Sequence, residues 1–139
     1  MSFVNFRAGL AGLSPAYFGM VMATGIVSIA AHLLGFAWLA RSLYALNCAF
    51  YVALWILYLL RLWWHPRAFF QDLFDHLRGP GYFTSIAASG VLGSQTIVLY
   101  GWLSAAFALW CVAIALWLVL TYAIFTILTV KESKPSLDR

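Results

Sequence analysis

The stretch LSAAFALWCVAIALWLVLTYAIFTILTV, residues 103–130, contains no charged side chain. A helix needs about 20 consecutive, mostly apolar residues to cross the roughly 30 Å of hydrocarbon in a bilayer. The stretch exceeds that length. It therefore predicts a transmembrane helix that is long enough to tilt or to protrude from the membrane.

The whole chain has the same apolar character. Of its 139 residues, 65% are hydrophobic and only 9% are charged, whereas soluble domains are close to half apolar and a quarter charged. A water-soluble fold of this size could not hide so much apolar surface, because small domains bury a smaller share of their surface than large ones. The composition therefore excludes a soluble globular protein and predicts an integral membrane protein.

Three further apolar stretches predict spans at 15–39, 43–64 and 81–100, in addition to 103–130. Lipid offers no hydrogen-bond partner to backbone amides, so each span is expected to be helical. Ser14 followed by Pro15 predicts the start of the first helix, with serine as the N-cap. The predicted fold class is all-α integral membrane, with about four transmembrane helices in two antiparallel hairpins, as a single membrane domain over residues 1–139.

The basic residues predict the orientation of these spans. Arg41 falls on one side of the predicted membrane, and seven basic residues fall on the other: Arg7, Arg61, Arg67, Arg78, Lys131, Lys134 and Arg139. The side with more Lys and Arg is normally cytoplasmic. We therefore expect a multi-pass protein of the plasma (cell inner) membrane, with both termini, the 65–80 loop and the tail 131–139 in the cytoplasm.

The 65–80 loop contains a helical pattern of its own. Its apolar residues share one helical face: Phe70, Leu73, Phe74 and Leu77. They predict an amphipathic helix over about 67–78 that lies on the inner membrane surface and is stopped by Gly79-Pro80. Asp72, Asp75 and His76 then belong to its solvated face, which we favour over a metal site because no further ligands cluster there.

Enzyme, cofactor and nucleic-acid signals are missing from the sequence. It contains no Gly-rich phosphate loop, GxSxG elbow or HExxH motif. Cys48 and Cys111 lie inside apolar spans without a CxxC pair, which argues against a thiol oxidoreductase. The formal charge of +4 is spread singly between apolar runs and forms no nucleic-acid-binding face. We expect no catalytic residue, no metal and no cofactor, and the lipid bilayer as a partner.

Small residues distinguish the spans from one another. Gly, Ala, Ser and Thr are frequent in 15–39 and 81–100 and rare in 43–64, which is rich in Leu, Tyr and Trp. Small residues allow helices to approach closely, so we predict that the first and third spans pack together while the second and fourth are peripheral. Two readings of the small polar positions stay open: helix packing, or the lining of a solute path. The candidate pore-lining residues are Thr24, Gly25, Ser28, Ser85, Ser89 and Gly93.

The position of the acidic residues favours an anion as the solute. All four (Asp72, Asp75, Glu132 and Asp138) lie outside the predicted spans. Proton-coupled carriers usually bury a carboxylate in the membrane, and cation paths usually carry acidic groups. A path of hydroxyls and backbone dipoles without carboxylates suits an anion.

Four segments resemble the tellurite-resistance/dicarboxylate transporter family, which includes malate and sulfite transporters and slow-type anion channels. They are SPAYFGMVMATGIVS (14–28), DHLRGPGYFT (75–84), VLGSQ (91–95) and LTVKESKPSL (128–137). The resemblance implies part of a ten-helix, five-hairpin fold around a central anion pore, with odd helices lining the pore and even helices outside. It also implies assembly as a homotrimer. No residue here corresponds to the family's phenylalanine gate, which lies on its ninth helix.

The leading functional hypothesis is transmembrane transport of anions or C4-dicarboxylates, with this chain as the N-terminal part of a channel or transporter. Missing C-terminal helices or other subunits would then complete the fold, and a small anion or dicarboxylate would be the substrate. The alternatives are a non-transporting four-helix membrane scaffold or subunit, or an inactive truncated fragment. A membrane enzyme is the third possibility.

Overall fold

The structure, a computed structural model, describes residues 5, 8–10, 12–75 and 78–130. Within these ranges it contains helices and no strand, which confirms the all-α prediction. Four helices are long and apolar enough to cross a membrane: Pro15–Leu33, Ala37–Trp64, Gly79–Tyr100 and Leu103–Ile127. The described elements are η1 (Pro15–Tyr17), α2 (Phe18–Leu33), α3 (Ala37–Trp64), α4 (Pro66–Phe74), η2 (Gly79–Tyr82), α5 (Phe83–Tyr100) and α6 (Leu103–Val130).

The predicted boundary between the first two spans was wrong. The first helix ends at Leu33 rather than residue 39, and α3 already begins at Ala37. Gly35 ends α2 with a φ of 87°, a left-handed conformation that glycine adopts without a steric cost. The Gly35 N–H bonds the His32 carbonyl at 3.1 Å, and the Phe36 N–H bonds the Ala31 carbonyl at 2.9 Å. These two bonds form a Schellman motif, which satisfies carbonyls at the helix end.

The other helix ends follow the sequence signals more closely. Ser14 accepts a hydrogen bond from the Ala16 N–H at 3.3 Å, and Pro15 occupies the first turn, as predicted. Gly101, with a φ of 66°, ends α5. Only Gly101 and Trp102 separate α5 from α6, so the third and fourth spans form an antiparallel hairpin, as predicted.

The helix predicted over 67–78 is present but shorter. Helix α4 covers Pro66–Phe74, and Asp75 is extended. Gly79-Pro80 does not stop this helix; it opens η2, with proline in the first turn. Leu77 and His76 lie outside the described residues, so the fourth apolar position of the predicted face is not described.

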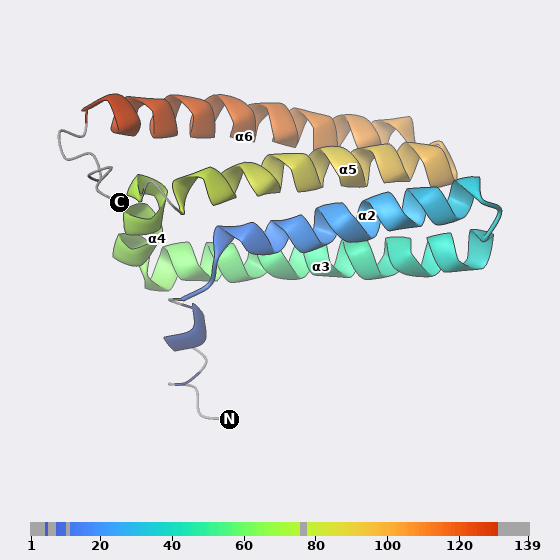
Figure 1. The fold of residues 1–139 in the computed structure, drawn as a ribbon, viewed down its shortest axis with the longest axis horizontal. Helices are drawn as coiled ribbons and strands as arrows, with labels where there is room; N and C mark the ends of the chain where they lie inside the picture. Colours follow the sequence, from blue (N-terminus) through green and yellow to red (C-terminus); the bar gives the residue numbers. More distant parts are fainter. Residues whose placement is uncertain (1–4, 6–7, 11, 76–77, 131–139) are drawn as a thin grey trace, which may run out of the picture.

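The long helices lie side by side in the order α3, α2, α5, α6 (Figure 1). Helix α2 packs against both α3 and α5, and α5 packs against α6. The share of buried residues is highest in the α5 span, at 44%, and lowest in the α6 span, at 17%. The prediction that the first and third spans pack together, with the second and fourth peripheral, is therefore confirmed.

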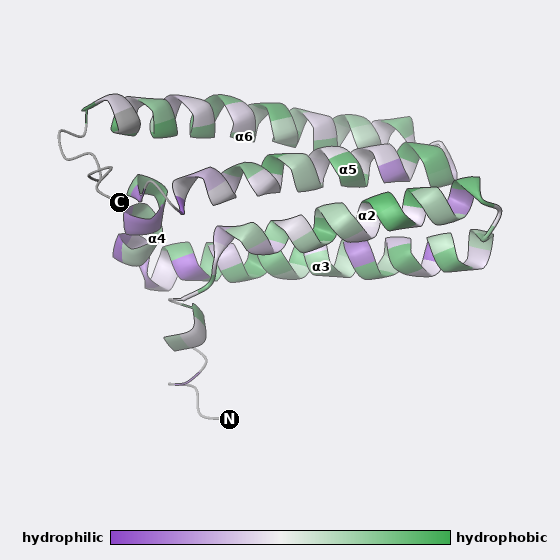
Figure 2. Ribbon diagram, in the orientation of Figure 1, coloured by the Kyte–Doolittle hydropathy of each residue, from purple (hydrophilic) through white to green (hydrophobic). Residues whose placement is uncertain are grey.

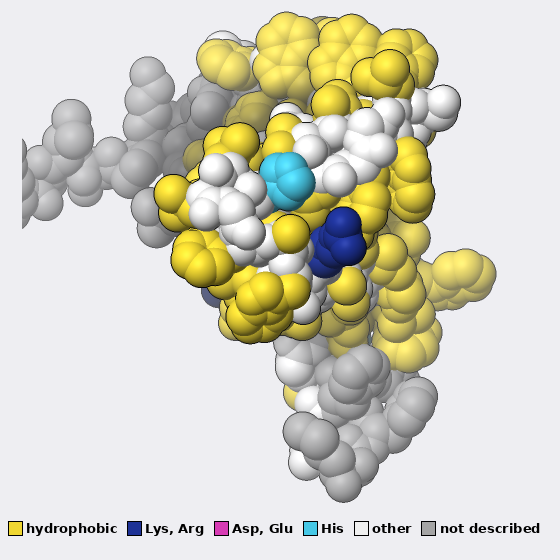
Figure 3. Space-filling view, turned by 90° about the vertical axis from the view of Figure 1, so that its right-hand side faces the viewer, with side chains coloured by type: hydrophobic (Ala, Val, Ile, Leu, Met, Phe, Trp, Pro, Cys, Tyr) yellow, Lys and Arg dark blue, Asp and Glu magenta, His cyan; other side chains and the backbone are white. Residues whose placement is uncertain are grey.

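Helix α4 lies across one end of the bundle, roughly perpendicular to the four long helices (Figure 1). Hydrophobic residues dominate the long helices, and hydrophilic residues gather at α4 (Figure 2). The opposite end holds the α2–α3 and α5–α6 turns. Figure 3 shows this end as mostly hydrophobic, with basic and histidine side chains but no acidic side chain on the face in view. The charged residues that the structure describes thus lie toward the two ends of the bundle, as expected for spans in a bilayer.

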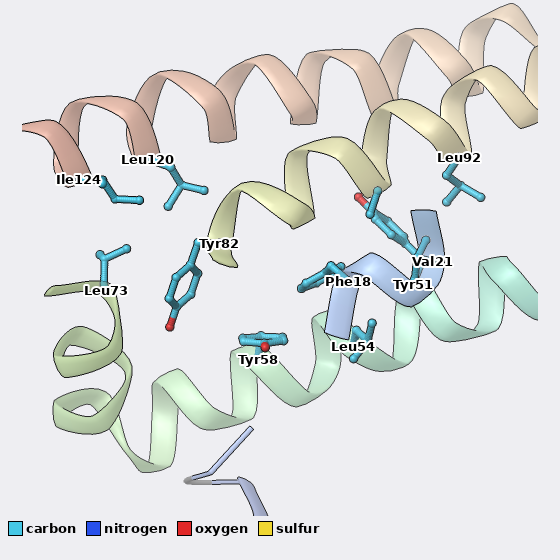
Figure 4. Packing of buried hydrophobic residues seen from close by; sticks show 11 residues of the cluster. Phe18, Val21, Tyr51, Leu54, Tyr58, Leu73, Tyr82, Leu92, Leu120 and Ile124 are labelled. Carbon is cyan, nitrogen blue, oxygen red and sulfur yellow. The ribbon is translucent and has the colours of Figure 1, made fainter. Parts of the chain in front are cut away.

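The core of the bundle is built from aromatic and aliphatic side chains of several helices (Figure 4). Phe18 at the start of α2 is its centre. Its ring lies 5.2 Å from the ring of Tyr58 and 5.5 Å from that of Trp55 on α3, between ring centroids. Tyr58 in turn donates a hydrogen bond to the Ser14 carbonyl. These contacts hold the entry to α2 against the far end of α3.

Candidate functional site

The six candidate pore-lining residues lie on α2 and α5. On α2, Gly25 and Ser28 are buried, and Thr24 is half-buried. The Ser28 hydroxyl donates to the Ala40 carbonyl of α3 at 2.8 Å. A Cβ added at Gly25 would lie 2.5 Å from a Val91 methyl group and 3.0 Å from the Asn47 amide nitrogen. Both positions therefore serve close contacts between helices.

The candidates on α5 are also buried. The Ser85 hydroxyl donates to the Tyr82 carbonyl at 2.7 Å, and the Ser89 hydroxyl lies 2.8 Å from the Ser85 carbonyl. Gly93 brings α5 close to α6: a Cβ there would lie 3.5 Å from the Ala106 carbonyl oxygen. The pore-lining role of all six residues stays a prediction, while contacts between helices are present at Gly25, Ser28 and Gly93.

A line of cross-helix hydrogen bonds joins α3 to α5; we call it the polar seam. Tyr44 and Thr96 share a hydrogen bond of 3.1 Å between hydroxyls, and Tyr51 and Ser89 share one of 2.7 Å. Between them, the Asn47 amide nitrogen donates to the Gln95 side-chain oxygen at 2.9 Å. Hydrogen-bonded polar side chains of this kind join helices within membranes.

Sequence reasoning missed the α3 half of the polar seam. It assigned 43–64 to lipid contact from its Leu, Tyr and Trp content. One stripe of this helix instead faces inward at helical spacing: Asn47, Tyr51, Leu54, Tyr58 and Arg61. The signal was present in the sequence, since polar and aromatic residues recurred at intervals of three and four.

The amide pair at the middle of the polar seam is fully buried. Asn47 and Gln95 both have 0% exposure. The Asn47 Oδ1 and Gln95 Nε2 atoms have no hydrogen-bond partner among the described residues. A buried polar atom without a partner costs about 1–3 kcal/mol, so the pair adds little net stability. Its benefit is directional, because one hydrogen bond between short side chains selects one register of α3 on α5.

A groove of about 790 Å³ runs along the contact of α5 and α6. On the α5 side the groove is lined by Ile97 and by four small residues: Ser89, Gly90, Gly93 and Ser94. The α6 side carries Ser104 and the larger Phe107 and Trp110. Ser94 and Ser104 are exposed, so their hydroxyls are accessible polar groups in an otherwise apolar groove. Two candidate pore-lining residues, Ser89 and Gly93, belong to this lining.

At the α4 end of the bundle, Asp72 forms a buried ionic cluster. Its Oδ2 atom lies 2.5 Å from Nη2 of Arg61, and its Oδ1 atom lies 3.1 Å from Nη1 of Arg78. Arg61 also donates to the Leu13 carbonyl at 2.8 Å. The assignment of Asp72 to a solvated face was therefore wrong. The buried Arg61 requires a neighbouring negative charge, because an isolated charge in an apolar environment is costly.

Comparison with known proteins identifies the family of this chain. Residues 12–138 match the family described as voltage-dependent anion channel. Neither a curated protein nor a solved structure matches the chain. The family match spans nearly the whole chain, and it agrees with the resemblance carried by residues 14–28, 75–84, 91–95 and 128–137. A protein with four apolar spans and this match is a membrane protein of the voltage-dependent anion channel family.

Proposed function

We propose that this chain forms the N-terminal part of an anion channel or transporter, and that the α5–α6 groove borders the anion path. The observation that carries this proposal is the groove itself. Its α5 side is lined mainly by Gly and Ser, whose small side chains leave space and add hydroxyl groups. Hydroxyls and backbone dipoles can replace part of an anion's hydration shell without introducing a fixed charge that would trap it.

The charges of the spans support an anion over a cation. The spans contain no Asp, Glu or Lys, but α3 contains Arg41 and Arg61. Asp72, which lies on α4 outside the spans, is paired with Arg61. A cation would therefore find no carboxylate within the spans to attract it. An anion would find no carboxylate there to repel it. Small inorganic anions or C4-dicarboxylates are the proposed substrates, and no catalytic step is proposed.

The candidate residues divide into two proposed roles. Ser89 and Gly93 border the groove, so they belong to the proposed path wall. Gly25 and Ser28 hold contacts between helices that support this wall, and Ser85 bonds the Tyr82 carbonyl at the start of its own helix. Thr24 is half-buried on α2 and stays a path candidate.

A second candidate function is a non-transporting membrane subunit. It is favoured by one specific observation: the hydroxyls of Ser28, Ser85 and Ser89 all bond carbonyls of this chain. If these serines served packing alone, lipid or another helix would fill the groove. The experiment described next separates the two functions.

The test is to fill the groove without disturbing the fold. Gly90→Leu is suitable because a Cβ at Gly90 meets no atom within 4 Å. Gly19→Leu is the matched control, since its Cβ is equally free and Gly19 does not line the groove. Chloride and malate flux would be measured in vesicles that hold the chain with the helices or subunits that complete the assembly.

Gly90→Leu is expected to reduce flux at least tenfold at unchanged assembly, and Gly19→Leu to leave flux within about twofold. Equal flux in both variants would remove the groove from the path. Flux absent from the unmodified assembly would favour the non-transporting subunit.

We further propose that both termini and α4 are cytoplasmic. Arg67 within α4 and Arg78 after it lie at one end of the bundle, and Arg41, in the first turns of α3, lies at the opposite end. This asymmetry follows the usual excess of basic residues on the cytoplasmic side.

A further inference from the structure

Helix α4 carries different chemistry on its three sides. The inward side fixes the helix to the bundle. The Phe69 ring meets the Tyr82 ring edge-on at 5.2 Å between centroids. Leu73 is buried and points toward Leu120 and Ile124 of α6 (Figure 4). Together with the buried Asp72, these contacts fix how α4 is rotated about its own axis.

The flank of α4 presents an aromatic pair. Each helical residue turns the chain by about 100°, so Phe70 and Phe74 lie about 100° around the axis from the inward-facing Phe69 and Leu73. Phe70 is 46% exposed and Phe74 is 42% exposed. Their rings stack with centroids 6.2 Å apart and planes at 26°. Two adjacent exposed phenylalanine rings would cost free energy in water, since apolar surface favours an apolar environment.

The outward side of α4 is polar and basic. Arg67 and Gln71 are both exposed. Arg67 forms no ion pair among the described residues, and Asp72, the acidic residue within α4, is directed inward to Arg61. Trp63, in the last turn of α3 just before α4, is 84% exposed. Tryptophan is enriched where spans meet lipid headgroups, so it marks the depth of this end of the bundle.

We propose that α4 is a membrane-surface anchor, in which Phe70 and Phe74 insert into the headgroup region and Arg67 contacts phospholipid phosphate. Its placement supports a lipid occupant. Helix α4 runs perpendicular to the spans (Figure 1), and therefore parallel to the membrane plane, at the level where the spans end. An amphipathic helix of this kind inserts its apolar side at the boundary of headgroups and acyl chains. The basic side chain of Arg67 complements the negative phosphate. This inference does not depend on the proposed anion path.

Spin-label depth measurements test the anchor. The full chain, with Cys48 and Cys111 replaced by alanine, would be reconstituted in phosphatidylcholine vesicles with and without phosphatidylglycerol. A nitroxide would be attached in separate variants, Phe70→Cys and Phe74→Cys. Gln71→Cys is the matched control on the same helix, because it lies on the outward side. Collision rates with oxygen, which partitions into lipid, and with a water-soluble nickel chelate report the depth of each label.

Labels at 70 and 74 are expected to collide several-fold more with oxygen than with nickel, and the label at 71 to show the reverse. Adding Arg67→Gln should remove any deepening caused by phosphatidylglycerol. Labels at 70 and 74 that both reagents reach as they reach 71 would place the aromatic pair in water and overturn the anchor. Labels that neither reagent reaches would show a protein cover and would also overturn it. Phe70 and Phe74 are both partly exposed, so a label can be attached at either position. One of the two variants is therefore sufficient for the test.

Discussion

Replacing Asp72 with asparagine is expected to destabilise the fold strongly, because it removes the charge that neutralises a buried arginine. Arg61 has 0% exposure, and its Nη2 atom lies 2.5 Å from Asp72 Oδ2. Removing one partner of a buried ion pair costs about 3–5 kcal/mol. Asparagine still offers an acceptor oxygen, so we expect the lower end, about 3 kcal/mol. That is a change of roughly 150-fold in the ratio of folded to unfolded protein.

Two variants serve as controls for this prediction. The Arg78 side chain is 48% exposed, and exposed ion pairs contribute about 0–1 kcal/mol, so Arg78→Gln should have little effect. The double variant Arg61→Met with Asp72→Leu removes both charges and fills the space with apolar groups. It is expected to recover most of the stability, because the desolvation cost of the arginine disappears.

The assay is unfolding of the purified chain in mixed detergent micelles with rising dodecyl sulfate, followed by circular dichroism. Free energies of unfolding would be compared at one micelle composition. An Asp72→Asn variant within about 1 kcal/mol of the unmodified chain would refute the argument that Arg61 depends on this carboxylate. A double variant as unstable as the single one would refute the argument that charge burial is the cause.

Three further predictions concern other contacts. Gly25→Ala should cost about 1–3 kcal/mol in the same unfolding assay, because its Cβ meets the facing helix at 2.5 Å; Gly19→Ala, in open space, should not, and equal effects would contradict the close contact. Tyr51→Phe should cost about 0.6 kcal/mol, a typical value for hydrogen bonds within membranes, and should cost nothing further in a Ser89→Ala background; an additive loss would mean that the two hydroxyls do not interact. An Arg67→Cys variant should react with an impermeant maleimide only after the cells are permeabilised. Labelling in intact cells would contradict the proposed orientation.

Much of the fold could be predicted from the sequence, and the exceptions have identifiable causes. The sequence predicts a first span that reaches residue 39, because Ala37 to Leu39 continue the apolar run and hydropathy does not mark the turn. Only the φ of 87° at Gly35 and the hydrogen bonds around it end the helix. The helix predicted over 67–78 is too long for a related reason, since helical spacing in the sequence continues to Leu77 while the backbone is extended at Asp75.

The sequence by itself determined that this chain enters a membrane, how many spans it has and which two are central. These properties follow from the hydropathy and the side-chain size of consecutive residues taken together. Lipid surrounds apolar residues without requiring a specific partner. Only the tertiary structure decided which polar groups meet. A serine at Ser89 suits a path or a packed helix equally well, and its contact with Tyr51 depends on the rotation of both helices. The pairing of Arg61 with Asp72 likewise forms only when α4 folds back across the end of α3. The sequence alone does not show which carboxylate a buried arginine meets.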